Sequence, residues 1–235
     1  GGRPADTLII FDWDDTLLCS SALSAGRWTP VQLRRVERAA GAVLRAALAL
    51  GETVIVTNGN GTWVQDSTAR FLPGLAPMLE RIDVLSARAR YEGLYPGDPV
   101  AWKRLAFKEL LACRRLRKEA ANTSSQDVNL IAVGDSPAEM EAARCSAEVL
   151  SQPSLVKTLK LKDAPSASEL VGQLRRVGRE LGAIVQEDRS SGKGLVQRSL
   201  PARLDRFPPS PSAGGRLPWR RQPEGSRRGV RACMG

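Results

Sequence analysis

Three short, mostly apolar runs that each end abruptly in polar residues constrain the fold of this chain more than any other feature. They lie at 7–11 (TLIIF), 53–56 (TVIV) and 128–133 (VNLIAV). Apolar runs of roughly four to eight residues are typical of strands that are buried on both faces of a parallel sheet. Weaker runs at 82–85 and 156–161 bring the expected sheet to about five strands.

Stretches with helical spacing of apolar residues separate these strands. The stretch 31–50 follows Thr29 and Pro30, which are suited to the start of a helix. Strands that alternate with helices predict an α/β fold with a doubly wound, Rossmann-like, mostly parallel sheet and helices on both faces. Ligands of such sheets bind beyond the carboxyl ends of the strands, where the strand order reverses. The other expected helices are 62–72, 100–117, 138–146 and one that the capping box Ser166-x-x-Glu169 opens.

The net charge of +10 is concentrated in the last part of the chain. Residues 186–235 hold eleven Lys and Arg against four Asp and Glu, with many Pro, Gly and Ser and few apolar residues. Such a composition buries too little apolar surface to fold. We therefore expect one folded domain over 1–185 and a disordered basic tail over 186–235. The net charge of the expected folded domain is close to neutral, which argues against a basic protein that binds nucleic acid.

Histidine and cysteine usage excludes whole classes of site. The chain contains no histidine, so triads and metal sites that use histidine are ruled out. Its four cysteines contain no C-x-x-C pair, which argues against a zinc ribbon and favours a reducing compartment.

No apolar run approaches the roughly 20 residues that span a bilayer, so we expect a cytoplasmic protein without a membrane partner. The chain starts at Gly1, as a fragment or a processed product would.

Three carboxylates directly follow the first expected strand. Asp12, Asp14 and Asp15 lie within one short stretch of chain. Carboxylates at such short separations repel one another, so a cluster of this kind is typical of a bound cation or a shared proton. An acidic turn is also compatible with a solvated loop. The residues at the other strand ends favour a bound cation over a solvated loop.

Polar groups also end the second and fourth expected strands. Thr57 ends the second strand and precedes Asn58, and Gly134 and Asp135 follow the fourth. Hydroxyl, amide and carboxylate groups are suited to phosphate or metal chemistry. Packing of a buried sheet does not require such groups at three strand ends.

Over residues 6–165 the order of these groups resembles the motifs of the haloacid dehalogenase superfamily of aspartate-nucleophile phosphohydrolases. One motif of that superfamily is a lysine or arginine near a helix start, for which we choose Lys103 over the rival Lys108. The superfamily more often has Asp at the position of Glu139, which argues against direct contact of Glu139 with a metal. The other matching residues are Asp12, Asp14 and Thr16 in a D-x-D-x-T pattern, Thr57, Gly134, Asp135 and Glu139.

The resemblance implies hydrolysis of phosphate monoesters in two displacements. Asp12 would attack phosphorus and form an aspartyl-phosphate, and Asp14 would act first as general acid and then as general base. Mg²⁺ would be held by Asp12, the backbone carbonyl of Asp14 and Asp135. Dehalogenases and phosphonate-cleaving members lack an acid at the position of Asp14, so the resemblance favours phosphate esters.

Phosphoryl oxygens would be bound by Thr57, Asn58 and Lys103, and the same resemblance assigns supporting roles to Thr16, Gly134, Ser136 and Glu139. Some of these residues also have a structural interpretation. Asn58 can simply terminate its strand, Lys103 can be a solvated helix residue, and Ser136 can cap a helix. We interpret Asp15 as structural because the motif leaves its position free. Trp28 and Trp63 follow strand ends and either stack on a substrate or pack in the core.

The gaps that hold lid domains in related folds are short in this chain. Only residues 17–29 separate the first strand from the first helix, and about a dozen loop residues follow the third strand. We therefore expect an open site and a large phosphorylated partner such as a phosphoprotein. The arginines of the tail are compatible with a nucleic acid or an acidic partner, and also with a terminus that is merely solvated. A phosphotransferase of the same fold and a non-catalytic binding module remain the alternatives.

Overall fold

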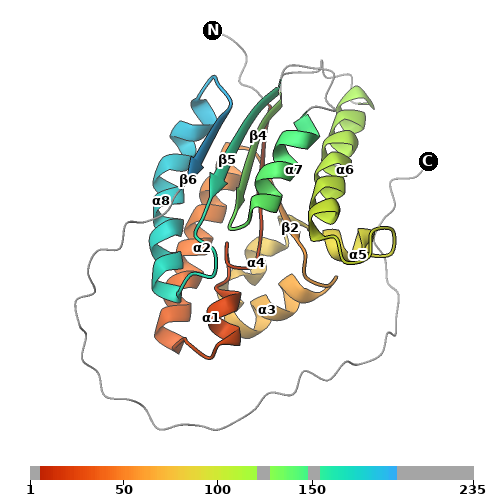
Figure 1. Cartoon of the computed structure of the whole chain (residues 1–235). Coiled ribbons are helices and arrows are strands. Elements are labelled where there is room, and N and C mark those ends of the chain that lie inside the picture. Colours follow the sequence, from red (N-terminus) through yellow and green to blue (C-terminus); the bar gives the residue numbers. More distant parts are fainter. Residues whose placement is uncertain (1–5, 121–127, 148–153, 195–235) are drawn as a thin grey trace. The chain divides into compact units, whose positions relative to one another are not determined.

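The computed structural model describes residues 6–120, 128–147 and 154–194, and within these ranges one sheet of six parallel strands forms the centre of the domain (Figure 1). The strand order is β3-β2-β1-β4-β5-β6, which confirms the predicted doubly wound α/β fold. This order reverses between β1 and β4. The strands are β1 (Asp6–Phe11), β2 (Glu52–Thr57), β3 (Asp83–Ser86), β4 (Val128–Gly134), β5 (Ser154–Lys160) and β6 (Ser191–Gly194).

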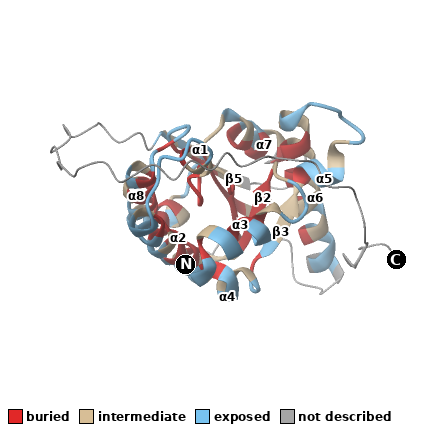
Figure 2. Cartoon of the chain, turned by 90° about the horizontal axis from the view of Figure 1, so that it is seen from below, coloured by how far each residue is buried: buried red, intermediate tan, exposed pale blue. Residues whose placement is uncertain are grey.

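Helices cover both faces of the sheet, and Figure 2 shows the buried strands between them. They are α1 (Ser20–Ser24), α2 (Pro30–Leu50), α3 (Trp63–Phe71), the 3-10 helix η1 (Pro73–Leu75), α4 (Ala76–Leu79), α5 (Ala87–Tyr91), α6 (Pro99–Ala120), α7 (Pro137–Ala147) and α8 (Ala167–Gln186). Alternate side chains of β1 point to opposite faces. Ile9 and Phe11 pack with α2, α3 and α8, whereas Leu8 and Ile10 pack with α5, α6 and α7. Across the described part of the chain, every helix is too short or too polar to cross a bilayer.

The ends of the two long helices on one face have the predicted capping groups. The Thr29 side chain accepts a hydrogen bond from a backbone N–H in the first turn of α2, at 3.2 Å. Ser166 and Glu169 form the predicted capping box of α8. A Cβ atom on Gly51 would lie 2.5 Å from the carbonyl oxygen of Thr7. Glycine therefore allows the chain to pass directly from α2 into β2 at this point.

The folded domain continues beyond residue 185, where we expected it to end, and the sheet has six strands instead of about five. β6 pairs with β5, with Lys157 opposite Ser191 and Lys160 opposite Gly194. The sequence of β6 is Ser-Gly-Lys-Gly, which has no apolar run, so backbone hydrogen bonds rather than buried side chains define this edge strand. The rest of the predicted tail, 195–235, lies outside the described residues.

Only short helices occupy the two positions at which we considered a lid domain. α1 lies between β1 and α2, and α5 lies between β3 and α6. Each has five residues. The carboxyl ends of the strands are therefore flanked by short connections in the described chain.

Candidate active site

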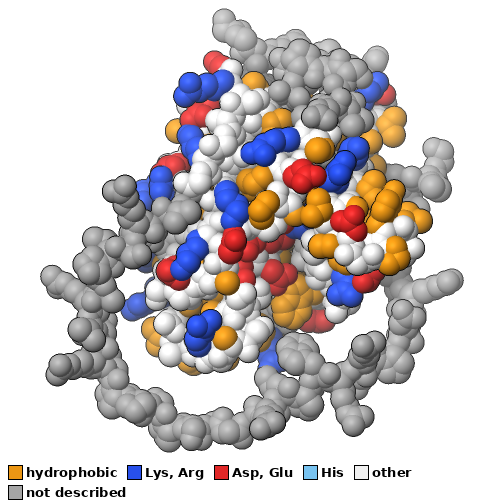
Figure 3. All heavy atoms as spheres, in the orientation of Figure 1, with side chains coloured by type: hydrophobic (Ala, Val, Ile, Leu, Met, Phe, Trp, Pro, Cys, Tyr) orange, Lys and Arg blue, Asp and Glu red, His pale blue; other side chains and the backbone are white. Residues whose placement is uncertain are grey.

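The candidate site lies beyond the carboxyl ends of β1, β2 and β4, at the reversal of strand order. β1 and β4 are neighbours, with Phe11 opposite Val133, and the backbone N–H of Asp12 donates to the Val133 carbonyl at 2.9 Å. Asp12 and Asp135 therefore follow adjacent strands at the same end of the sheet. Figure 3 shows acidic side chains gathered in a hollow between α1 and α7.

Lys103 contacts Asp12 from the first turns of α6. Its Nζ atom lies 2.5 Å from Oδ1 of Asp12, 2.9 Å from Oε1 of Glu139 and 2.8 Å from the Val56 carbonyl oxygen. Only 1% of Lys103 is exposed. The structure thus brings Lys103, rather than its rival Lys108, to the carboxylate cluster.

Burial changes the protonation of this cluster. It raises the pKa of Asp12 to about 8, with Glu139 and Asp135 adding to the rise and Lys103 opposing it. It likewise raises the pKa of Asp135 to about 7, with contributions from the negative charges of Glu139 and Asp15. Burial lowers the pKa of Lys103, but Asp12 and Glu139 raise it more, so the ammonium stays charged. The Lys103 ammonium thus contacts both Asp12 and Glu139. The negative charges of Glu139 and Asp135 meanwhile disfavour ionisation of Asp12.

Glu139 is held between Lys103 and the start of α7. Its Oε2 atom accepts hydrogen bonds from the Ser136 N–H at 3.1 Å and the Ser136 hydroxyl at 2.7 Å, while this hydroxyl accepts from the Ala138 N–H at 3.1 Å. Ser136 therefore caps α7. A Cβ atom on Gly134 would lie 2.6 Å from Cγ of Glu139. Glycine at 134 therefore leaves room for the Glu139 side chain that contacts Lys103.

Asp14 is bound by a tryptophan that the sequence did not assign to the site. The indole Nε1 of Trp63 donates to both carboxylate oxygens of Asp14, at 2.9 and 3.1 Å. The hydroxyl of Thr57 lies 3.4 Å from Oδ2 of Asp14 and accepts from the Gly59 N–H at 2.9 Å. Trp63 is thus neither a core residue alone nor a free stacking surface. No sequence pattern indicates this contact, since no motif links residues 14 and 63.

The next two residues of the loop stabilise its shape. Asp15 has a positive φ of 53° and accepts hydrogen bonds from the N–H, at 3.0 Å, and the hydroxyl of Ser21. This agrees with the structural role that we expected for Asp15. Thr16 places its hydroxyl 3.5 Å from Oδ1 of Asp135, which connects the loop to the end of β4.

Three other side chains near this edge have contacts that the sequence left open. The amide group of Asn58 donates to the Pro99 carbonyl at 3.2 Å, and its buried Oδ1 has no partner among the described residues. Trp28 packs edge-on against Phe71, with ring centroids 6.1 Å apart. Lys160 donates a hydrogen bond to the backbone carbonyl of Asp135, a contact that no motif indicates.

The carboxylates of Asp12 and Asp135 fit a hard divalent cation. Both have raised pKa values because of burial and like charges, and a cation would relieve that cost. Among the described residues, no group donates a hydrogen bond to Oδ2 of Asp12, which leaves this oxygen available. The described ranges contain no metal-binding cluster of three or more Asp, Glu, Cys or His side chains. The predicted set needs only two side chains and the Asp14 carbonyl, so it is compatible with this absence.

We expect the metal-free protein to lose stability as the pH rises from about 5 to about 8. The pKa values of about 8 for Asp12 and about 7 for Asp135 exceed the ordinary value of 3.8, so the folded state retains protons that the unfolded state has lost. Thermal unfolding in chelator should show a falling melting temperature over this window, and Asp12→Asn should reduce the slope. A melting temperature that rises with pH in this window would contradict the raised pKa values.

Comparison with protein-family models, curated proteins and solved structures yields no match. A functional class must therefore be inferred from the site itself.

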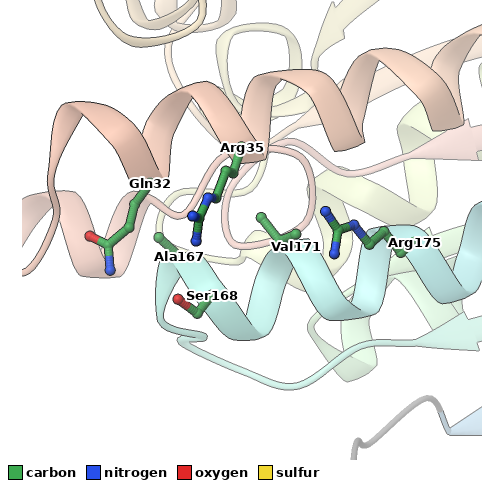
Figure 4. A pocket seen from close by; sticks show the side chains of 6 residues that line it. All are labelled: Gln32, Arg35, Ala167, Ser168, Val171 and Arg175. Atoms are coloured by element: carbon green, nitrogen blue, oxygen red, sulfur yellow. The ribbon is translucent and has the colours of Figure 1, made fainter. Parts of the chain in front are cut away.

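A separate cavity of about 340 Å³ lies between α2 and α8 (Figure 4). It is lined by Gln32, Arg35, Ala167, Ser168, Val171 and Arg175, none of which belongs to the candidate site.

Proposed function

We propose that this chain is an Mg²⁺-dependent phosphatase of the haloacid dehalogenase type, which hydrolyses phosphate monoesters through an aspartyl-phosphate. The observation that carries the proposal is the position of Asp12. This carboxylate follows β1 at the reversal of strand order, contacts Lys103 at 2.5 Å and leaves one oxygen available beside the end of β4. A buried carboxylate with an unengaged oxygen is the kind of group that forms a covalent phosphoryl intermediate.

The reacting groups of the two displacements are two carboxylates, the phosphate ester and water. An oxygen of Asp12 forms a bond to phosphorus while the bond from phosphorus to the ester oxygen breaks, and Asp14 gives that oxygen a proton. Asp14 then takes a proton from water, whose oxygen attacks phosphorus and releases phosphate and the Asp12 carboxylate. Mg²⁺, held by Asp12, Asp135 and the Asp14 carbonyl, would supply positive charge that offsets the repulsion between carboxylate and phosphate.

In this proposal Lys103 is less free to bind a phosphoryl oxygen than the sequence implied. An ammonium group has three N–H donors. The contacts of Lys103 with Asp12, Glu139 and Val56 use all three. Lys103 therefore holds Asp12 in place and offsets its charge, and it binds a phosphoryl oxygen only by giving up one of these contacts. Thr57 and Asn58 are the other candidates for phosphoryl oxygens.

Hydrolysis of p-nitrophenyl phosphate is expected to require Mg²⁺. Without a divalent cation the negative charges of Asp12, Asp135 and the phosphate oppose one another, so chelation should abolish turnover and added Mg²⁺ should restore it. The measurement is the release of nitrophenolate with Mg²⁺, with chelator and after Mg²⁺ is restored. Equal rates under all three conditions would exclude the proposed chemistry.

The same assay with other substrates distinguishes the alternatives. We propose a large phosphorylated partner, such as a phosphoprotein, because only the five-residue helices α1 and α5 stand where a lid would be inserted. Phosphopeptides should then be hydrolysed better than free sugar phosphates, and the opposite preference would contradict this substrate class. Phosphorylation of an added alcohol instead of water would indicate the phosphotransferase. Absence of turnover on every ester would favour the binding module.

A further inference from the structure

We infer that Trp63 is a positioning residue that orients the Asp14 carboxylate toward the leaving oxygen of the substrate. The inference rests on the proposed function, in which Asp14 is the general acid. The indole N–H donates to both oxygens of Asp14, at 2.9 and 3.1 Å, and so fixes the rotation of the carboxylate. The Thr57 hydroxyl, at 3.4 Å, is too far away to do so alone.

The turn before α3 leaves room for the indole only because residue 59 is glycine. A Cβ atom on Gly59 would lie 2.3 Å from Cδ1 and 2.8 Å from Cγ of Trp63. Any other residue would displace either the ring or the turn. The backbone between β2 and α3 is therefore fitted to an indole in this position.

A second tryptophan also connects the loop of Asp14 to α3. Trp13, which is fully buried between Asp12 and Asp14 in the sequence, donates its indole N–H to the Ser67 hydroxyl at 2.9 Å. That hydroxyl donates to the carbonyl oxygen of Trp63 at 2.6 Å. Helix α3 thus contacts the loop of Asp14 at two points, through the Ser67 hydroxyl and through the Trp63 side chain.

The expected effect of Trp63 depends on the leaving group. Alkyl oxygens leave poorly without a proton, whereas nitrophenolate leaves readily as an anion. Since proton transfer depends on alignment of donor and acceptor, loss of the indole N–H should slow the cleavage of alkyl esters most. A purely structural role would slow both esters alike.

The test compares Trp63→Phe, which keeps an aromatic ring and removes the N–H, with the control Asp83→Asn at the exposed first position of β3. We expect Trp63→Phe to lower kcat/KM for phosphoserine at least about tenfold more than for p-nitrophenyl phosphate. The control should lower both by less than about twofold. Equal losses for the two esters in Trp63→Phe, or no loss, would overturn the inference.

A spectroscopic measurement without substrate or metal separates this inference from the proposed function. In the ¹⁵N-labelled full chain, the indole N–H resonance of Trp63, identified by its absence in Trp63→Phe, should shift strongly in Asp14→Ala and little in Asp83→Asn. An unchanged resonance in Asp14→Ala would overturn the contact itself. If the resonance shifts in Asp14→Ala but the wild-type chain hydrolyses neither ester, the proposed function is overturned and, with it, the catalytic purpose of the contact.

Discussion

Replacement of Asp12 by asparagine is expected to lower kcat for p-nitrophenyl phosphate by at least about 10³-fold, because an amide oxygen does not form the covalent intermediate. The variant should fold, since asparagine has nearly the shape of aspartate and the pKa of Asp12, about 8, already shows that its charge is costly to bury. Circular dichroism and thermal unfolding measure the fold, and steady-state kinetics with Mg²⁺ measures the loss.

Asp83→Asn provides the matched control for this variant. Asp83 is exposed at the amino end of β3, whereas the candidate site lies beyond the carboxyl ends of the parallel strands. Its replacement should leave kcat within about twofold of the wild type. Equal kinetics of the Asp12 and Asp83 variants would assign the hydrolysis to another residue or to a contaminant.

Replacement of Lys103 by methionine is expected to destabilise the fold by about 3 kcal/mol. Methionine fills similar space but leaves the buried carboxylates of Asp12 and Glu139 without their cation, and breaking a buried pair in this way costs roughly 3–5 kcal/mol. The loss should be at the lower end because Asp12, with its raised pKa, can take up a proton instead. Urea unfolding at pH 7 measures the change in the free energy of unfolding.

Lys108→Met separates this effect from a general effect of charge on α6. Lys108 lies on the same helix, is half-buried and forms no ion pair with the described residues. Its replacement should change the free energy of unfolding by less than about 0.5 kcal/mol. Comparable losses in both variants would show that Lys103 does not neutralise the carboxylate cluster.

The principal site residues were predictable because a parallel sheet brings the carboxyl ends of its strands together. Asp12, Thr57 and Asp135 follow strands whose apolar runs are evident in the sequence, so their proximity requires only the strand order. The structure supplies that order, in which β1 lies between β2 and β4. Lys103 was predictable in kind from the resemblance, and its distance to Asp12 distinguishes it from Lys108.

Contacts that depend on side-chain direction were not predictable. The indole N–H of Trp63 reaches Asp14 because α3 begins at this residue and Gly59 leaves room for the ring, and neither condition has a sequence pattern of its own. The same holds for Lys160, which reaches the Asp135 carbonyl from the neighbouring strand. β6 escaped prediction because its pairing depends on backbone groups, which every sequence possesses.

The phosphorylation state of Asp12 during turnover tests the central claim most directly. The protein is mixed with p-nitrophenyl phosphate and Mg²⁺, quenched in acid and digested, and the peptides are examined by mass spectrometry. We predict a phosphoryl group on the peptide that contains Asp12, and no such peptide with chelator or in Asp12→Asn. Continued hydrolysis without any phosphorylated form of that peptide would contradict a covalent mechanism at this residue.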